Sequence, residues 1–385
     1  MNRRLLTETP SANCQPSRPP TPWIMHGAFK RFALLAAFSI AGSLLAVMTS
    51  NAADDTMAET GTKFKADADM QSVLDALAAM NPKPIESLAV AEARKQPTPA
   101  DAVIEVLKRQ GKDTSPTALV PGVTSEDRTI PGPASSLPVR IYTPTGAGPF
   151  PVIVYFHGGG WVIADKEVYD GGARGLAKEA GAVVVSVDYR RAPEAKFPAA
   201  WDDAFAAYKW VAQNAASLKG NPKKIALAGE SAGGNLAIAT AIAARDAGVQ
   251  APLHIVAVYP VAQTGDMMTQ SYVDSATAKP LNKAMIGWFV DKLLAKPEAK
   301  TDPRLDLVHA DLKGLPPVTI INAQIDPLRS DGDMLETALK NADVKVNHKL
   351  YSGVTHEFFG MAAAVKKAKE AQKFAGGHLK KAFGG

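Results

Sequence analysis

From residue 139 onward, short apolar runs rich in β-branched residues alternate with longer stretches in which apolar residues recur with a helical period. The apolar runs predict buried strands at 139–143, 151–156, 182–187, 224–228, 253–259, 318–322 and 344–350. The helical period predicts helices at 171–180, 199–217, 231–245, 330–341 and 362–382. This alternation predicts the α/β fold class, with a mostly parallel central sheet and helices on both faces.

Two segments differ from this alternation. Upstream of it, amphipathic patterns predict helices at 64–80 and 99–110, the second with Thr98 as its N-cap. The stretch 111–138 is rich in Pro, Gly, Ser and Thr, so we expect a linker with one short strand. Residues 262–316 show one helical pattern, at 281–295, and no strand pattern, which indicates an insertion into the α/β domain.

An apolar run at 32–48 follows a Lys-Arg pair and leads through small residues to Ala52. This order is that of a secretory signal peptide, so we expect cleavage near Ala52 and an exported, periplasmic or released protein whose mature form has no membrane span. An uncleaved anchor is the alternative, since the run approaches the length of a span. Residues 1–24 fit no part of a signal peptide, so Met25 competes with Met1 as the start of translation.

The charge of the chain is concentrated in that N-terminal segment. The 43 Lys and Arg outnumber the 38 Asp and Glu, but residues 1–52 hold five basic residues and one acidic residue. The remainder is close to neutral, which gives no electrostatic case for a nucleic-acid partner. The single cysteine, Cys14, also lies there, which excludes disulfides, cysteine metal sites and a thiol nucleophile in the rest of the chain.

A six-residue motif, Gly229-Glu230-Ser231-Ala232-Gly233-Gly234, joins the predicted strand 224–228 to the predicted helix 231–245. A G-x-S-x-G sequence at such a junction is typical of a nucleophile elbow, in which the serine lies at a helix N-terminus that stabilises negative charge. Ser231 is therefore the candidate nucleophile. The alternative is a purely structural turn.

A second glycine motif directly follows the strand 151–156, where His157 precedes Gly158, Gly159 and Gly160. Consecutive glycines leave backbone N–H groups unshielded, and such donors can stabilise a developing oxyanion. The alternatives are a flexible turn and a phosphate loop, although the spacing of a phosphate loop is absent.

A serine nucleophile needs a base and an orienting acid, which follow it in this architecture in the order acid, then histidine. Among the histidines after Ser231, only His356 lies in a loop directly after a predicted strand. Asp326 follows the strand 318–322 and is the candidate acid. Its rivals are Asp331 and Asp333, which resemble charges at a helix N-terminus.

Taken together, these motifs resemble those of the hormone-sensitive-lipase-like esterases, a branch of the α/β hydrolases. The similarity covers about residues 126–375 and includes further motifs at 188–194, 197–203, 311–317 and 326–328. The resemblance implies an α/β hydrolase fold with a helical cap. Together with the signal-peptide pattern, it divides the chain into an extension with signal peptide at 1–52, a cap region at 53–125 and a catalytic domain at 126–385, with 262–316 as a further contributor to the cap.

The resemblance also implies a role for each motif residue: Ser231 as nucleophile, Asp326 as acid, His356 as base, the backbone of Gly159, Gly160 and Ala232 as oxyanion donors, Gly158 as the residue that sets the loop, and His157 as a structural residue. It implies hydrolysis of small-molecule esters with short acyl chains through an acyl-serine, with no metal or cofactor. Amide or lactone hydrolysis on the same triad is one alternative. A non-catalytic ligand receptor is the other, and the presence of His356 argues against it.

The remaining conspicuous residues have structural interpretations. We expect Arg190, Glu194, Asp202 and Asp203 to form a charge network rather than to bind substrate. Trp161 either lines the pocket or packs the glycine loop.

Overall fold

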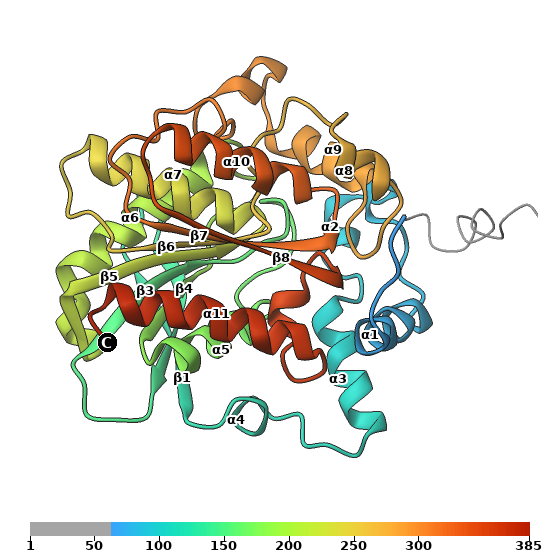
Figure 1. Cartoon of the computed structure of the whole chain (residues 1–385), viewed down its shortest axis with the longest axis horizontal. Helices are drawn as coiled ribbons and strands as arrows, with labels where there is room; N and C mark the ends of the chain where they lie inside the picture. Colours follow the sequence, from blue (N-terminus) through green and yellow to red (C-terminus); the bar gives the residue numbers. More distant parts are fainter. Residues whose placement is uncertain (1–62) are drawn as a thin grey trace, which may run out of the picture. The chain divides into compact units, whose positions relative to one another are not determined.

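An eight-stranded sheet crosses the computed structural model, which describes residues 63–385 (Figure 1). The strand order is β1-β2-β4-β3-β5-β6-β7-β8, antiparallel between β1, β2 and β4 and parallel from β4 to β8. The strands are β1 Val123–Ile130, β2 Leu137–Pro144, β3 Phe150–Phe156, β4 Val183–Val187, β5 Gly220–Glu230, β6 Ile255–Val258, β7 Val318–Ile325 and β8 Val346–Thr355. The signal peptide, the cleavage near Ala52 and the start at Met25 lie outside the described residues.

Helices cover both faces of this sheet, as the alternation in the sequence predicts. The longer helices are α1 Ala68–Ala79, α3 Pro99–Arg109, α5 Asp170–Ala180, α6 Ala199–Asn214, α7 Ala232–Asp246, α9 Lys283–Leu293, α10 Arg329–Asn341 and α11 Lys366–Ala382. Shorter helices are α2 Val90–Ala93, α4 Pro116–Leu119 and α8 Gln270–Asp274, with 3-10 turns at Ile85–Ser87, Ala215–Leu218, Pro297–Thr301 and Phe358–Met361. Among residues 63–385, none of these helices is long and apolar enough to cross a membrane.

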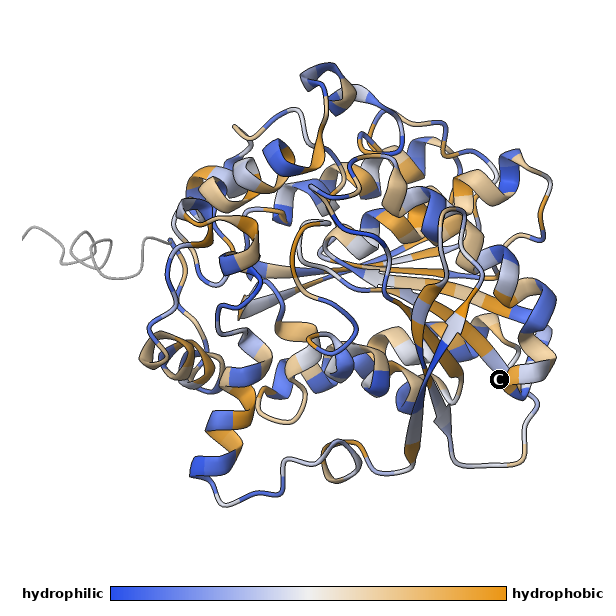
Figure 2. Ribbon diagram, turned by 180° about the vertical axis from the view of Figure 1, so that it is seen from behind, coloured by the Kyte–Doolittle hydropathy of each residue, from blue (hydrophilic) through white to orange (hydrophobic). Residues whose placement is uncertain are grey.

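Burial on both faces explains why the central strands are apolar without interruption. In β3, Val152 and Val154 belong to the core under α6, α7 and α10, whereas Ile153 and Tyr155 belong to the core under α5 and α11. Figure 2 shows the result, with hydrophobic strands between helices that carry both hydrophobic and hydrophilic residues. A strand buried on both faces loses the polar alternation that would mark a solvated face.

One region differs from the sequence prediction. The stretch expected as a linker with one short strand contains β1, which is 8 residues long and pairs with β2 along its whole length. Six of its positions are exposed and only Val123 and Ile130 are buried. An exposed edge strand lacks the apolar signal by which the other strands were predicted, which is why the prediction was too short.

The N-terminal helices are joined to the rest of the chain at a few defined points. Thr98 caps α3 as predicted, in a capping box with Asp101. The N–H of Asp67, just before α1, donates to the carbonyl oxygen of Gly353 in β8 at 2.8 Å. Arg94, which follows α2, donates to the carbonyl oxygens of Val162 and Ala192, in the loops that follow β3 and β4.

The insertion 262–316 contains α8 and α9, and the helix predicted at 281–295 is confirmed by α9. Its two ends lie side by side, because the N–H of Leu307 donates to the carbonyl oxygen of Ala262 at 2.8 Å. Asn235 of α7 fixes both ends, donating through Nδ2 to the carbonyl oxygens of Val261 at 3.1 Å and Leu305 at 3.4 Å. The insertion therefore leaves and re-enters the domain at one point.

Candidate active site

Ser231 lies in the sharp turn between β5 and α7. Its backbone has φ +56°, a conformation that is strained for a residue other than glycine. The turn is closely packed, since a Cβ on Gly229 would overlap the carbonyl oxygen of Gly233, and one on Gly233 would overlap that of Phe156. The N–H of Ser231 donates to the carbonyl oxygen of Val258 at 2.8 Å, which fixes the turn against the end of β6. This geometry matches the elbow that the motif predicts.

His356 and Asp326 meet Ser231 from two neighbouring strand ends. His356 directly follows β8, and its Nε2 lies 2.9 Å from Oγ of Ser231. Asp326 directly follows β7, and its Oδ2 lies 2.7 Å from Nδ1 of His356, while its Oδ1 accepts the N–H of Leu328 at 2.8 Å. Both side chains are buried. With its proton on Nδ1, His356 can accept the hydroxyl proton of Ser231 through Nε2.

The surroundings of His356 favour its charged form. Burial by itself lowers the pKa of the imidazole, but the Asp326 carboxylate, assisted by Glu357 and Glu230, outweighs burial. The net effect raises the pKa of His356 above its ordinary value. The site therefore stabilises an imidazolium next to Ser231.

The two rival acids have other partners. Oδ2 of Asp331 accepts the N–H groups of Ala262 at 3.0 Å and Gln263 at 3.3 Å, at the start of the insertion. Asp331 lies in the first turn of α10, as its interpretation as a helix N-terminal residue predicts, but it is fully buried and burial raises its pKa to about 8. Asp333 is half exposed at its side chain and lies 3.9 Å from Nε2 of His348. The other histidines after Ser231 also have separate partners: Thr319 for His254, Asp306 for His309, Glu336 for His348 and Phe374 for His378.

The glycine loop after β3 packs so tightly that side chains would not fit. A Cβ on Gly158 would overlap the hydroxyl of Tyr169, and one on Gly160 would overlap the ring of Phe289 in α9. Gly159 and Gly160 also have φ values of +94° and +59°, which glycine adopts without strain. The loop is thus held in one conformation next to Ser231.

His157 supports this loop and does not line the pocket. Its Nδ1 lies 2.8 Å from the carbonyl oxygen of Gly158, and its ring stacks on Tyr189 with centroids 4.2 Å apart. The Tyr189 hydroxyl donates to the carbonyl oxygen of His157 at 2.8 Å. These contacts are those of a residue that shapes the loop.

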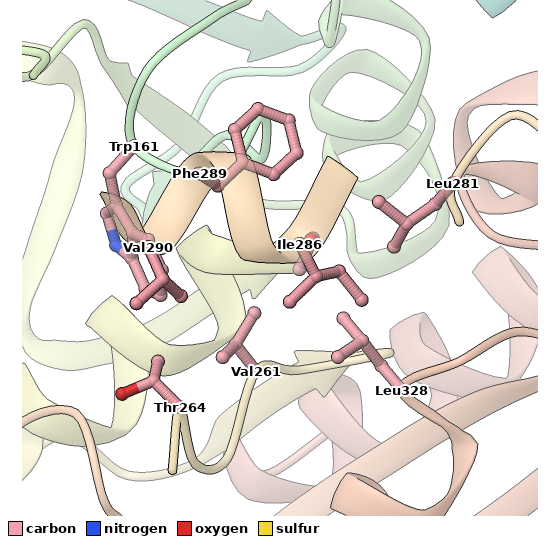
Figure 3. Close-up of a pocket in the computed structure, with 10 residues that line it drawn as sticks. Trp161, Val261, Thr264, Leu281, Ile286, Phe289, Val290 and Leu328 are labelled. Atoms are coloured by element: carbon pink, nitrogen blue, oxygen red, sulfur yellow. The ribbon is translucent and has the colours of Figure 1, made fainter. Parts of the chain in front are cut away.

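A small apolar pocket adjoins Ser231 (Figure 3). Figure 3 shows Ile286 of α9 facing Val261 and Leu328 across the pocket. The lining residues are Gly160, Trp161, Ser231, Val261, Thr264, Leu281, Ile286, Phe289, Val290 and Leu328. None of them is charged, half come from the insertion, and none comes from residues 63–125. Trp161 has both of the roles considered for it. It lines the pocket, and its ring also packs against the ring of Trp201, with centroids 5.2 Å apart.

Sequence reasoning missed the walls of this pocket. In α9, Ile286, Phe289 and Val290 have the helical spacing of one buried face, so the signal was present, but the sequence does not say which surface that face covers.

A second missed residue is Arg94, which donates through Nε to the carbonyl oxygen of Val162 and through an Nη to that of Ala192, both at 2.8 Å. It also forms a bidentate pair with Glu194. The predicted charge network is therefore divided, because Glu194 pairs with Arg94 while Arg190 pairs with Asp203 at 2.7 Å.

Comparisons with known proteins show what the chain resembles. A family model described as the alpha/beta hydrolase fold matches residues 153–360. The chain is 38% identical over 280 residues to carboxylesterase NlhH of Mycobacterium tuberculosis, covering 71% of this chain and 88% of that protein. It is 31% identical over 294 residues to an ethyl acetate hydrolase of Pseudomonas putida, covering 74% of this chain and 88% of that enzyme. A solved esterase from Pyrobaculum calidifontis superposes with a TM-score of 0.74 at 34% identity, covering 83% of this chain and 99% of that one.

Proposed function

The chain belongs to the α/β hydrolases, in their hormone-sensitive-lipase-like carboxylesterase group, and from this premise we propose that Ser231, His356 and Asp326 are its nucleophile, base and acid. As a member of this group the protein is a carboxylic ester hydrolase. The observation that carries the assignment of roles is the continuous set of hydrogen bonds from Ser231 through His356 to Asp326, at the wall of an apolar pocket.

In the first half of the reaction, Oγ of Ser231 attacks the ester carbonyl carbon while Nε2 of His356 takes the hydroxyl proton. His356 then gives that proton to the leaving alkoxide, and an acyl-serine remains. In the second half, a water molecule attacks the acyl carbon and His356 takes its proton. Return of this proton to Oγ releases the carboxylic acid and restores Ser231. Throughout, Asp326 holds Nδ1–H and stabilises the imidazolium.

The negative oxygen formed in both halves needs hydrogen-bond donors. We assign these to the backbone N–H groups of Gly159, Gly160 and Ala232, with Gly158 as the residue that sets the loop. Support comes from the pocket, which Gly160 lines together with Ser231, and from the position of Ala232 at the N-terminus of α7.

The substrate that fits this site best is an uncharged ester with a short acyl chain. The pocket is small and apolar, and its lining offers no charge to bind an ionised group. Hydrolysis of p-nitrophenyl esters graded from acetate to decanoate tests this. We expect kcat/KM to be highest for short chains and to fall steeply as the acyl group outgrows the pocket, and a maximum at long chains would contradict the assignment.

We also propose that the protein is exported, on the strength of the signal-peptide pattern that ends near Ala52. N-terminal sequencing of the exported protein tests this. A chain beginning at Ala53 or Asp54 is expected, whereas a chain that retains residues 32–48 would favour an anchor.

A further inference from the structure

A buried carboxyl group lies directly behind the nucleophile. Glu230, the last residue of β5 and the neighbour of Ser231, is 1% exposed. Its Oε1 accepts the hydroxyl of Tyr155 and its Oε2 accepts the hydroxyl of Tyr259. Both hydrogen-bond partners are hydroxyl groups and neither is a cation. A carboxyl group in such a place costs folding free energy, which calls for a functional explanation.

The space around Glu230 is kept open for it. A Cβ on Gly172 of α5 would overlap Oε1 of Glu230. Because glycine has no side chain, the backbone of α5 can lie directly against the carboxyl group. Burial raises the pKa of Glu230 to about 7, against the two tyrosine hydroxyls, which lower it. The group therefore takes up its charge near neutral pH, in the range in which a histidine titrates.

This carboxyl group is coupled to His356. The ring of Tyr259, which Glu230 holds by its hydroxyl, lies against the ring of His356 with centroids 4.5 Å apart. Glu357, next to His356, accepts the hydroxyl of Tyr169 at 3.0 Å. The ionisable groups that act on His356 are thus Asp326 after β7, Glu357 after β8 and Glu230 at the end of β5, with Tyr259 after β6 against its ring.

The groups that act on Glu230 come from the same elements and from two others. They are Tyr155 of β3, Tyr169 at the start of α5, Tyr259, His356 and Glu357. All of them are hydroxyl or carboxyl groups except His356. The imidazole is therefore the one group in this set that can become a cation and so receive the stabilisation that a Glu230 charge supplies.

We propose that Glu230 is a positioning residue for ester hydrolysis: clamped by Tyr155 and Tyr259, it holds the Tyr259 ring against His356 and supplies negative charge that stabilises the His356 imidazolium in both half-reactions. The proposal rests on the proposed role of His356 as base. It adds to the triad a second source of negative potential that acts on the same imidazole as Asp326.

The test is the pH dependence of kcat/KM in Glu230→Gln, which keeps the shape of the side chain and removes its charge. Without that charge His356 becomes harder to protonate, so we expect the acid limb to move to lower pH by roughly one unit. The transition state loses the same stabilisation, so the plateau above the limb should fall by about tenfold. A lower plateau with an acid limb at lower pH is a result that loss of folding stability alone does not produce.

Two further variants complete the experiment. Asp203→Asn removes another buried carboxylate, the partner of Arg190, and should lower the unfolding temperature without moving the acid limb. Tyr259→Phe keeps the ring and the Glu230 carboxyl but removes one of its two hydroxyl donors, so the limb should shift in the same direction by less. This variant carries the test if Glu230→Gln does not fold.

An acid limb that coincides with that of the wild type in Glu230→Gln and Tyr259→Phe would overturn the proposal and leave Glu230 a structural residue. Such a result would not touch the triad assignment, which is tested separately by the loss of activity in Ser231→Ala.

Discussion

The strand ends and the insertion 262–316 both form the active site, but they are held in place by different means. Ser231, Asp326 and His356 follow strands of one continuous parallel ladder, so the sheet register sets the distances between them. The insertion has no strand, is tied at its two ends, and reaches the pocket through apolar side chains of α9. We therefore expect changes at the strand ends to affect all esters alike and changes in the insertion to alter the choice among esters.

The largest effect is expected at the nucleophile. Ser231→Ala should reduce kcat by about 10⁴- to 10⁶-fold for every ester and leave the fold intact, because it removes only one oxygen from a closely packed turn. Kinetics and thermal unfolding should be measured together. Ser186→Ala, a buried serine in β4 of the same sheet, serves as the control and should keep near-normal kcat. Retention of activity within about tenfold of the wild type in Ser231→Ala would refute the assignment.

The next largest effect separates the two buried acids. Asp326→Asn should lower kcat by about three to four orders of magnitude, because an amide favours the wrong tautomer of His356 and cannot stabilise the imidazolium. Asp331→Asn should change kcat little, because the amide oxygen can still accept the N–H groups of Ala262 and Gln263. The reverse pattern of kcat values would mean that Asp331 is the acid.

The pH profile provides a third test of the strand ends. Because the pKa of His356 is raised, the imidazole is protonated at a pH above its ordinary pKa of about 6.5, and a protonated base cannot accept the Ser231 proton. Activity should therefore fall as the pH drops through a value above about 6.5, with the same midpoint for short and long esters. A midpoint below the ordinary value would indicate that burial outweighs Asp326.

A smaller and selective effect is expected in the insertion. Ile286→Ala should enlarge the pocket and raise kcat/KM for a hexanoate ester relative to acetate by about tenfold or more, with kcat for acetate little changed. Val273→Ala alters an apolar residue of the same insertion that is 58% exposed and does not line the pocket, so its ester preference should match the wild type. If kcat/KM fell equally for all esters in Ile286→Ala, the insertion would not control ester preference separately from the strand ends.

The smallest effect is expected in the N-terminal region. Arg94→Met removes the hydrogen bonds to the carbonyl oxygens of Val162 and Ala192, next to the glycine loop. We expect kcat to fall a few-fold with unchanged ester preference, whereas Glu194→Gln, which keeps those bonds, should be near neutral because the Glu194 side chain is exposed. A changed ester preference in Arg94→Met would show that the N-terminal helices also shape the pocket.

The same comparison explains what the sequence could predict. β3 to β7 could be predicted because burial on both faces demands apolar runs, and Ser231 and Asp326 could be predicted because each follows such a run. β8 lies at the edge of the sheet and is buried mainly at its end, so the strand predicted at 344–350 stops short of Thr355, which directly precedes His356. The exposed strand β1 gives no such signal.

Contacts between distant parts of the chain are the other feature that could not be predicted from the sequence. Arg94 pairs with a glutamate 100 residues away, and Asp331 accepts the N–H groups of Ala262 and Gln263, which lie 69 and 68 residues away in the sequence. Neither contact leaves a local pattern of residues. The residues that line the pocket could not be predicted for the same reason. The sequence of α9 shows that the helix has an apolar face, but it does not show which surface that face contacts.

The clamp formed by Asn235 has a consequence for how such enzymes can diversify. The side-chain amide of Asn235 holds the two ends of residues 262–307 close together. We therefore expect that this segment can be exchanged or lengthened without a change in the order of the strands. A replacement would have to keep the contacts that hold this segment, namely the carbonyl oxygen of Leu305 that accepts from Asn235 and the N–H groups of residues 262 and 263 that donate to Asp331, together with an apolar helix face. We therefore expect an exchange of this segment between relatives to change the range of esters accepted, while the sheet keeps Ser231, Asp326 and His356 in place.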